Sequence, residues 1–257
     1  MFEDQLGNKI ELKMAPKRII SLVPSQTELL YSLGLEEEVV GITKFCVHPH
    51  SWLKKKTIIG GPKTLHLNKI AELKPDLIIG NKEENTKEQI EKAQAIAPVW
   101  LSDIYNLTDS LEMIERVADI TSKAEEGKRI VQQIKDNFST LKPLKKQPLV
   151  LYLIWKKPYI AVASKTFINH ILTVCLGAKN ALENQERYPE LNMENLPEVD
   201  YVFLSTEPYP FKEKHFPEIK ALFPKAKVLL VDGEYFSWYG SRLIETAKYL
   251  EELKNSM

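Results

Sequence analysis

The chain has 257 residues, and its contents of 44% hydrophobic and 27% charged residues are those of an ordinary globular protein. Its 35 lysine and arginine residues balance 35 aspartate and glutamate residues, so no net charge draws it to nucleic acid or to an anionic membrane. No stretch approaches the ~18 consecutive apolar residues of a membrane-spanning helix. The two cysteines, Cys46 and Cys175, belong to no zinc or redox motif and do not make a disulfide framework.

The most strongly patterned stretch near the start is residues 18–35, preceded by a short strand or hairpin within residues 2–13. Residues 19–23 are apolar and rich in β-branched side chains, which predicts a strand covered on both faces. Ser25 and Glu28 have the spacing of a capping box, and Gly34 ends the helix that follows. A strand that turns directly into a helix places free amides at the edge of a sheet where α/β proteins bind ligands.

Between residues 39 and 101, short apolar strands alternate with helical patterns. Strands are predicted at residues 39–42, 57–59, 77–80 and 99–101, and helices at residues 67–74 and 86–94. Thr86 and Gln89 repeat the capping-box spacing at the start of the second helix. This alternation indicates βαβ units and a mostly parallel sheet.

Residues 108–141 form an almost uninterrupted helical pattern, with apolar residues spaced by three and four. Gly127 lies within it and either bends the helix or costs it about 1 kcal/mol. A second α/β region follows, in which Ser164 is the expected cap of a helix. Its strands are predicted at residues 149–154, 160–163, 201–204 and 228–231, and its last helix at residues 243–253.

The predicted fold class is therefore α/β, with two Rossmann-like lobes that have mainly parallel sheets and are joined by one long α-helix. The predicted boundaries are residues 1–107 for the amino-terminal lobe, 108–147 for the helical linker and 148–257 for the carboxyl-terminal lobe.

Common catalytic and nucleotide-binding motifs are absent: there is no glycine-rich phosphate loop, no GxSxG elbow and no HExxH. His48 and His50 share a loop and could be metal ligands, but no histidine pair has the i, i+4 spacing of a helical metal site. Glu207, Asp232 and Glu234 follow predicted strands, where an acid or base could act. Because no nucleophile and base are paired, the sequence favours a protein that is not an enzyme and holds no metal of its own.

Aromatic and polar residues recur just after the predicted strands. They are Phe45, Asn81, Trp155, Tyr209, Tyr235, Phe236, Trp238 and Tyr239. Any one of these aromatic residues could pack in a local core. Together, they favour a cleft lined by flat side chains, which suits a large and partly apolar ligand.

Three segments, PKRIISLVPSQTELLYSLGL, VVGIT and GGPKTLHLNKIAELKPDLIIG, resemble the amino-terminal lobe of the class III periplasmic binding proteins. These receptors capture vitamin B12, haem and ferric siderophores for ABC importers. SKTFINHILTVCLGAKN resembles the helix that opens their carboxyl-terminal lobe, so the resemblance covers nearly the whole chain. The cobalamin-binding branch is the most similar. The resemblance implies a monomer that binds a small molecule, needs no covalent cofactor, and meets an ABC permease at a membrane.

Carried over position by position, the resemblance places Phe45, Pro62, Asn81, Trp155 and Tyr188 along the ligand cleft, where cobalamin binders mostly carry aromatic residues. Pro62 and Asn81 depart from that character. The segment at residues 235–238 adds the last wall, and Lys63, Asn81 and Ser164 could orient polar groups of the ligand. The full predicted set is Phe45, Pro62, Lys63, Asn81, Trp155, Ser164, Tyr188, Tyr235, Phe236 and Trp238.

The resemblance also implies permease docking through one surface acid in each lobe. Glu194 matches the acid of the second lobe, whereas Asn68 occupies the position in the first. An asparagine cannot form the charge-assisted pair, so one docking contact would be weakened. Without the resemblance, Glu194 reads as an ordinary acid in the first turn of a helix.

The expected function is capture of a corrinoid, or of another metal chelate, in the cleft between the lobes, as the substrate-binding component of an ABC-type importer. The alternatives are a ferric siderophore or haem binder, or an intracellular enzyme, sensor or scavenger that uses the same cleft. The first residues carry early acids and lack the apolar core of a secretory signal. The expected location is therefore the periplasm or cell envelope if a leader has been removed, and the cytoplasm if Met1 is the native start.

Overall fold

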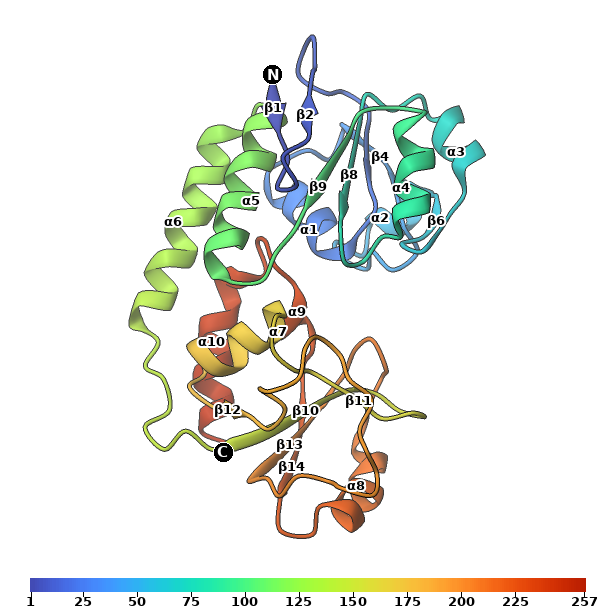
Figure 1. Cartoon of the computed structure of the whole chain (residues 1–257). Coiled ribbons are helices and arrows are strands. Elements are labelled where there is room, and N and C mark those ends of the chain that lie inside the picture. The colour runs from blue at the N-terminus through green and yellow to red at the C-terminus, as the bar shows by residue number, and fades with distance from the viewer. The chain divides into compact units, whose positions relative to one another are not determined.

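The computed structural model describes all residues, Met1–Met257, and divides into two compact units (Figure 1). Unit 1 contains Met1–Ile104, Thr108–Lys135 and Tyr239–Ile244, and unit 2 contains Tyr105–Leu107, Asp136–Trp238 and Glu245–Met257. Residues 239–244, near the end of the chain, thus belong to the same unit as the first strands. None of the helices has the length and apolar character needed to cross a membrane.

Unit 1 is built on a five-stranded sheet in which every neighbouring pair is parallel. In spatial order its strands are β5 (Thr57–Ile58), β4 (Val39–Ile42), β3 (Ile19–Ser21), β8 (Leu77–Asn81) and β9 (Val99–Ser102). Its first helices are α1 (Pro24–Ser32), α2 (Trp52–Lys55), α3 (Leu67–Glu72) and α4 (Lys87–Gln94). Most of the strand residues are apolar and buried because helices and loops cover the sheet, which confirms the predicted parallel α/β arrangement.

The start of α1 differs from the predicted capping box. Val23 precedes the helix without a side-chain cap, and Pro24 occupies the first turn, where its missing N–H costs nothing. Ser25 is therefore inside the helix and buried. The second predicted cap is present, because Thr86 accepts a hydrogen bond from the Gln89 amide at 3.4 Å.

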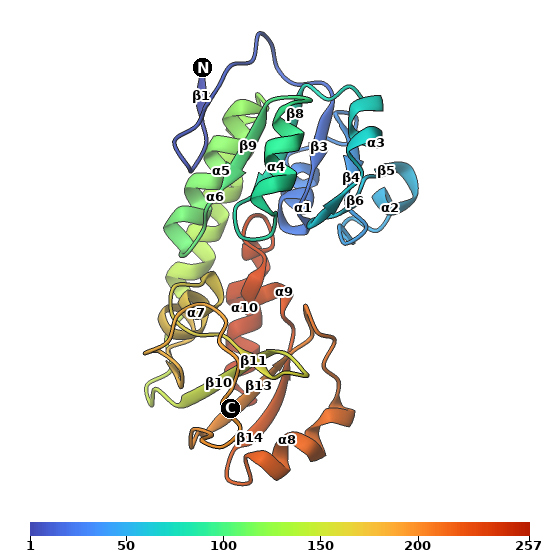
Figure 2. The same cartoon turned by 45° about the vertical axis from the view of Figure 1, so that its right-hand side comes forward.

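The region predicted as one uninterrupted helix is a pair of helices, α5 (Leu107–Ile120) and α6 (Ala124–Thr140), which lie side by side in Figures 1 and 2. The break falls at Ser122, whose φ of 59° is left-handed, and the Lys123 amide closes the turn by donating to the Ala118 carbonyl at 2.7 Å. Gly127 neither bends α6 nor weakens it. A Cβ at Gly127 would lie 2.3 Å from the Cβ of Ala118, so the missing side chain is what lets the two helices approach.

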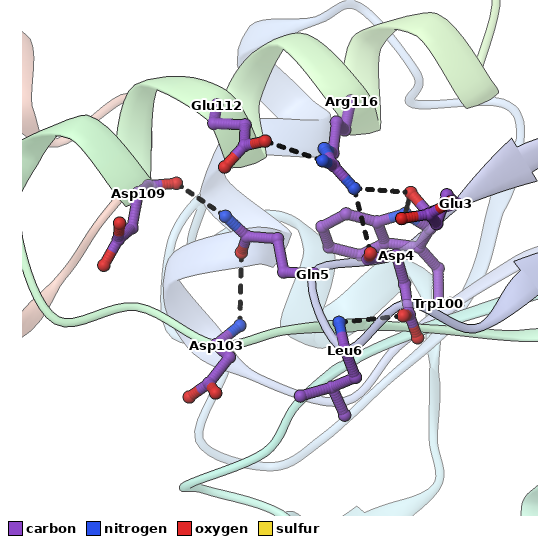
Figure 3. Close-up of polar contacts among 9 residues, drawn as sticks. All are labelled: Glu3, Asp4, Gln5, Leu6, Trp100, Asp103, Asp109, Glu112 and Arg116. Atoms are coloured by element: carbon purple, nitrogen blue, oxygen red, sulfur yellow. Dashed lines mark hydrogen bonds and ion pairs between the residues drawn. The ribbon is translucent and has the colours of Figure 1, made fainter.

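The amino-terminal hairpin of β1 (Phe2–Glu3) and β2 (Lys9–Ile10) confirms the prediction for residues 2–13 and is fastened to unit 1 by polar contacts (Figure 3). Asp4 is buried and accepts hydrogen bonds from the Leu6 and Asn8 amides at 2.9 and 2.8 Å. Arg116 of α5 donates to the carbonyl of Asp4 at 2.9 Å. The Gln5 amide donates to the Leu101 carbonyl at 3.1 Å, so the segment covers the edge strand β9.

Unit 2 has a second, mainly parallel sheet. Its path is β11 (Ile160–Ala161), β10 (Leu149–Trp155), β13 (Tyr201–Ser205) and β14 (Lys227–Val231), with β12 (Lys179–Asn180) also parallel to β10 and only β11 antiparallel. Its helices are α7 (Phe167–His170), which continues as the π-helical turn Ile171–Cys175, and α8 (Phe216–Leu222), α9 (Glu234–Ser237) and all but the first two residues of α10 (Leu243–Lys254). The cap of α7 is Thr166, which accepts from the Asn169 amide at 3.1 Å, and not Ser164 as predicted.

Candidate functional site

Phe45 stands on the loop after β4, at the carboxyl edge of the unit 1 sheet, and its side chain is 54% exposed. Its ring lies over Gly61, where an added Cβ would meet the ring at 3.3 Å. Gly61 belongs to the short hairpin of β6 (Gly60–Gly61) and β7 (Thr64–Leu65), whose turn carries Pro62 and Lys63. The fold thus brings these three predicted ligand residues, Phe45, Pro62 and Lys63, to one corner of unit 1.

Cys46 fixes the loop that carries Phe45. Its thiol is fully buried and lies 3.0 Å from the Thr27 hydroxyl and 3.2 Å from the Thr43 hydroxyl. Burial raises the pKa of the Cys46 thiol to about 11, so the group stays neutral and unreactive. The role of Cys46 in this loop is therefore structural.

Asn81, the last residue of β8, is buried, and its amide is committed within unit 1. Its side-chain nitrogen donates to the Ser102 hydroxyl at 2.9 Å, while its oxygen accepts from the amides of Glu83 and Glu84 at 2.8 and 3.0 Å. This is the pattern of an Asx turn that shapes the loop after the strand. The Asn85 side chain extends the network by donating to the Pro62 carbonyl at 2.9 Å.

In unit 2, Trp155 ends β10 and is 40% exposed. Tyr209 packs edge-on against it, with the ring centroids 5.8 Å apart. The Tyr209 amide donates to the Ile154 carbonyl at 3.2 Å, which ties the loop after β13 to the end of β10. Trp155 thus presents an exposed aromatic surface and is held in position by its packing against Tyr209.

Tyr188 and Ser164 lie on two segments that pair through backbone hydrogen bonds. The Arg187 amide donates to the Ser164 carbonyl and the Ala163 amide to the Arg187 carbonyl, both at 2.8 Å. Arg187 has a φ of 62°, in the left-handed region, and its guanidinium lies 5.9 Å from the centroid of the Tyr188 ring. The Ser164 hydroxyl donates to the Gln185 carbonyl, so it is already engaged.

The segment predicted as the last wall separates into three environments. Phe236 is fully buried and packs edge-on against Tyr152 and Phe203, so it belongs to the core of unit 2 and has no surface left for a ligand. Tyr235 is half-buried and stacks on Tyr249, with ring centroids 4.4 Å apart.

Trp238, the third residue of that segment, is 5% exposed, and its indole N–H donates to Glu207 at 2.9 Å. The Ser237 hydroxyl donates to the same carboxylate oxygen at 2.5 Å. Burial raises the pKa of the Glu207 carboxyl. The hydrogen bonds from Ser237 and Trp238 lower this pKa, and the negative charge of Glu234 raises it further. Sequence reasoning noticed Glu207 only as a strand-end acid, and its partnership with Trp238 has no signal in the sequence, because it depends on how α9 packs on the end of β13.

Two of the acids predicted after strands, Glu207 and Asp232, are engaged in hydrogen bonds within unit 2. No group of three or more His, Cys, Asp and Glu side chains is placed to hold a metal ion. Asp232 accepts from the Glu234 amide at 3.1 Å, and Glu207 is occupied by Trp238 and Ser237. The acids around the amino-terminal hairpin serve internal contacts, such as the 2.6 Å pair between Glu112 and Arg116 (Figure 3).

The two predicted docking residues are both exposed. Asn68 lies in the first turn of α3. Glu194 lies in a turn outside any helix, where its amide donates to the Asn192 side chain at 3.0 Å, so it is not the first-turn helix acid that the sequence suggested. Their docking role stays a prediction.

Unit 2 also has a hollow of about 420 Å³ at the opposite edge of its sheet, where β10, β13 and β14 begin. Its lining comes from the strand starts and from the end of α8, and consists of Leu149, Leu196, Pro197, Glu198, Val199, Asp200, Leu222, Phe223, Pro224, Lys225 and Ala226. None of the predicted ligand residues lies in it.

The family model for periplasmic binding proteins matches residues 19–217. An uncharacterized ABC transporter substrate-binding lipoprotein of Bacillus subtilis (strain 168) is 26% identical over 97% of this chain and 83% of its own length. A vitamin B12-binding protein of Photorhabdus laumondii is 24% identical over 93% of this chain and 88% of its own length.

Solved structures show the same fold. The periplasmic haem-binding protein of Roseiflexus sp. RS-1 has a TM-score of 0.81 at 20% identity, covering 93% of this chain and 97% of that one. The petrobactin-binding protein of Bacillus subtilis has a TM-score of 0.79 at 19% identity, covering 97% and 96%. The two-lobe fold with parallel sheets and the resemblance drawn from the sequence are both confirmed. The chain belongs to the periplasmic binding protein family, whose members are substrate-binding proteins of transport systems and not enzymes.

Proposed function

We propose that this chain is the substrate-binding component of an ABC-type importer and that its ligand is a corrinoid or another metal chelate. The observation that carries this proposal is the exposure of Phe45 and Trp155 at the carboxyl edges of the two sheets. Each ring is held on one side by the protein, over Gly61 and against Tyr209, and is open on the other. Rigid aromatic surface of this kind suits a large conjugated ligand.

The proposed activity is binding without chemical change. The aromatic faces would supply apolar contact, and the exposed Lys63 would supply a charged one. Asn81 and Phe236 would stabilise their units without contacting the ligand. The side chain of Asn81 already forms internal hydrogen bonds, and Phe236 is buried in the core. The names of relatives that bind vitamin B12, haem and petrobactin support a chelate as the ligand class.

The proposed partner is an ABC permease, docked through Glu194 in unit 2. Asn68 would provide only an uncharged contact in unit 1, so the docking would depend more on the second unit. The lipoprotein name of the Bacillus subtilis relative supports a location in the cell envelope.

A thermal-shift titration tests the ligand class, using cyanocobalamin, haemin and a ferric siderophore as separate probes. A ligand at 100 times its Kd that binds only the folded state adds about 2.7 kcal/mol, enough to raise the midpoint by a few degrees. A saturable rise with one probe is expected, and no rise with any of them would contradict the proposal.

Substitution of Trp155 tests the site. Trp155→Ala should weaken binding of the active probe by at least about 1 kcal/mol, or roughly fivefold, the scale of an aromatic anchor. Tyr31→Ala is the matched control, because Tyr31 is 46% exposed but lies on α1, outside the predicted set. Equal affinity in wild type and Trp155→Ala would remove Trp155 from the site.

A further inference from the structure

We infer that the ligand of this protein carries negative charge, and that Lys44, Phe45 and Lys63 of unit 1 form the corner that recognises it. This inference rests on the proposed function and deepens it, because it narrows the ligand from a chelate of any charge to an anionic one. We call these three residues the cationic corner.

Two members of the cationic corner, Lys44 and Phe45, lie over one glycine. A Cβ at Gly61 would lie 3.3 Å from the Phe45 ring and 3.6 Å from the side chain of Lys44, so both side chains rest on the bare backbone of β6. The Lys44 ammonium lies 5.0 Å from the centroid of the Phe45 ring. Lys63 is in the turn of the same hairpin. The Phe45 ring and the Lys44 ammonium therefore border the same small area, and Lys63 adds a second positive charge on the adjoining turn.

The corner is held in place before any ligand arrives. The Lys44 amide donates to the Gly60 carbonyl at 2.9 Å, which joins the loop after β4 to the hairpin. Gly60 has a φ of 104°, and a Cβ there would lie 2.2 Å from the Thr64 carbonyl oxygen, so only glycine allows this turn. Cys46 is buried behind the loop and anchors it. The loop therefore loses little conformational entropy when a ligand binds, which favours high affinity.

The two lysines of the corner have no carboxylate bound to them. Lys44 and Lys63 are exposed, and neither forms an ion pair with a carboxylate. Lys82, on the neighbouring loop after β8, is by contrast paired with Asp103 at 2.6 Å. The Glu84 carboxylate of that loop accepts from the Tyr239 hydroxyl at 2.8 Å. An anionic ligand would supply the missing partner for two ammonium groups.

Unit 2 repeats the pairing of a cation with a predicted ligand aromatic. Arg187 lies over Tyr188, and its left-handed backbone is held by the two hydrogen bonds to residues 163 and 164. The third cation–π contact in the protein, between Lys56 and Trp52, involves a fully buried ring that no ligand can reach. Both contacts at accessible rings therefore fall on residues of the predicted site.

These features define the ligand class by its chemistry. A flat conjugated chelate that bears carboxylate or catecholate groups would use the ring of Phe45 and the ammonium groups of Lys44 and Lys63 together. A chelate without ionised acidic groups would use the ring alone.

The test compares haemin, which has two free carboxylates, with cyanocobalamin, which has none, by equilibrium titration of tryptophan fluorescence at low and high salt. The affinity for haemin should exceed that for cyanocobalamin and fall as salt screens the lysines. The affinity of Lys44→Glu/Lys63→Glu for haemin should be lower than that of wild type by about tenfold or more. Lys9→Glu/Lys13→Glu is the matched control, since both lysines are exposed and precede β3 in the same unit, and it should change the affinity by less than about twofold.

The outcomes separate the inference from the proposed function. Tighter binding of cyanocobalamin than of haemin, or haemin binding that is equal in wild type and Lys44→Glu/Lys63→Glu, overturns the charge inference while leaving chelate binding intact. Failure of haemin, cyanocobalamin and a ferric siderophore alike overturns both. Lys44→Gln/Lys63→Gln, which removes charge without reversing it, guards against a folding defect, and its thermal midpoint should match that of wild type.

Discussion

Glu207 connects the core of unit 2 to the predicted ligand residue Trp238. Its carboxylate holds the Trp238 indole and the Ser237 hydroxyl, and an added Cβ on Gly233 would meet the Glu207 side chain at 2.6 Å. The acid is therefore enclosed by the start and the end of α9. Its role is to position Trp238. This position removes water from the carboxyl group, which disfavours its charged form.

This enclosure predicts a pH-dependent effect of Glu207→Gln. Because burial raises the pKa of Glu207 in the folded state, the folded protein binds more protons than the unfolded chain between the ordinary value, about 4.3, and the raised one. Stability from this group is therefore complete below the ordinary value and is lost as pH rises through that interval. Glutamine does not titrate, so the midpoint of Glu207→Gln relative to wild type should rise as pH increases from the ordinary pKa of a glutamate through the raised pKa of Glu207.

Thermal unfolding at several pH values measures this difference, with Glu194→Gln as the control for losing one exposed glutamate. A midpoint difference, Glu207→Gln minus wild type, that stays constant or falls as pH rises would show that burial does not raise the pKa of Glu207.

At the scale of elements, the contact between α5 and α6 depends on Gly127. Alanine is a better helix former than glycine by about 1 kcal/mol, so propensity alone predicts that Gly127→Ala stabilises α6. The added methyl would stand 2.3 Å from Ala118, and overpacking costs about 1–3 kcal/mol. We therefore expect Gly127→Ala to lower the stability of unit 1 by about 1 kcal/mol. Urea unfolding measures this change in the free energy of unfolding.

The double variant Ala118→Gly/Gly127→Ala should recover part of the lost stability. If Gly127→Ala is more stable than wild type, α5 and α6 can move apart without cost, and the close contact at Gly127 is not important.

The segment Tyr239–Ile244 is fastened to α1 by an ion pair between Arg242 and Glu28, with contacts of 2.7 and 3.1 Å. The side chains are only 12% and 18% exposed, so removing one partner leaves a nearly buried charge. Arg242→Met should therefore destabilise unit 1 by about 3 kcal/mol, and Glu28→Gln/Arg242→Met should restore much of it.

The exposed pair Lys92–Glu88 on α4, also at 2.7 Å, provides the matched control for Arg242→Met. Lys92→Met should change thermal stability little, because solvent screens that pair. Hydrogen exchange of the α1 amides locates the effect. Equal losses in Arg242→Met and Lys92→Met would contradict the view that burial makes the Arg242 pair important.

Across the whole molecule, the sequence predicted the fold better than the site. Strands such as β8 and β10 are continuous apolar runs, and their pattern survives in any α/β arrangement. The helical region was harder, because its apolar stripe runs through the break at Ser122 and nothing local marks a turn there. Short elements such as α2 and β12 carry too few residues to show a period.

The candidate site shows where sequence reasoning ends. Exposure of Phe45 and Trp155 follows from their position after a strand, which the sequence reveals. The burial of Phe236 and the internal hydrogen bonds of Asn81 do not, because they depend on partners far along the chain, such as Tyr152 and Ser102. The pairing of Arg242 with Glu28 spans nearly the whole sequence and is likewise invisible in it.

The most direct test of the central account is a binding measurement with recovery of the ligand. The purified full chain is saturated with the probe that raises its midpoint most, the stoichiometry is measured by calorimetry, and the probe is then released and analysed by mass and absorption spectrum. A binding protein predicts one chelate per chain, reversible uptake and a released ligand identical to the one supplied. A chemically altered ligand, or no saturable uptake of any chelate, would contradict the account.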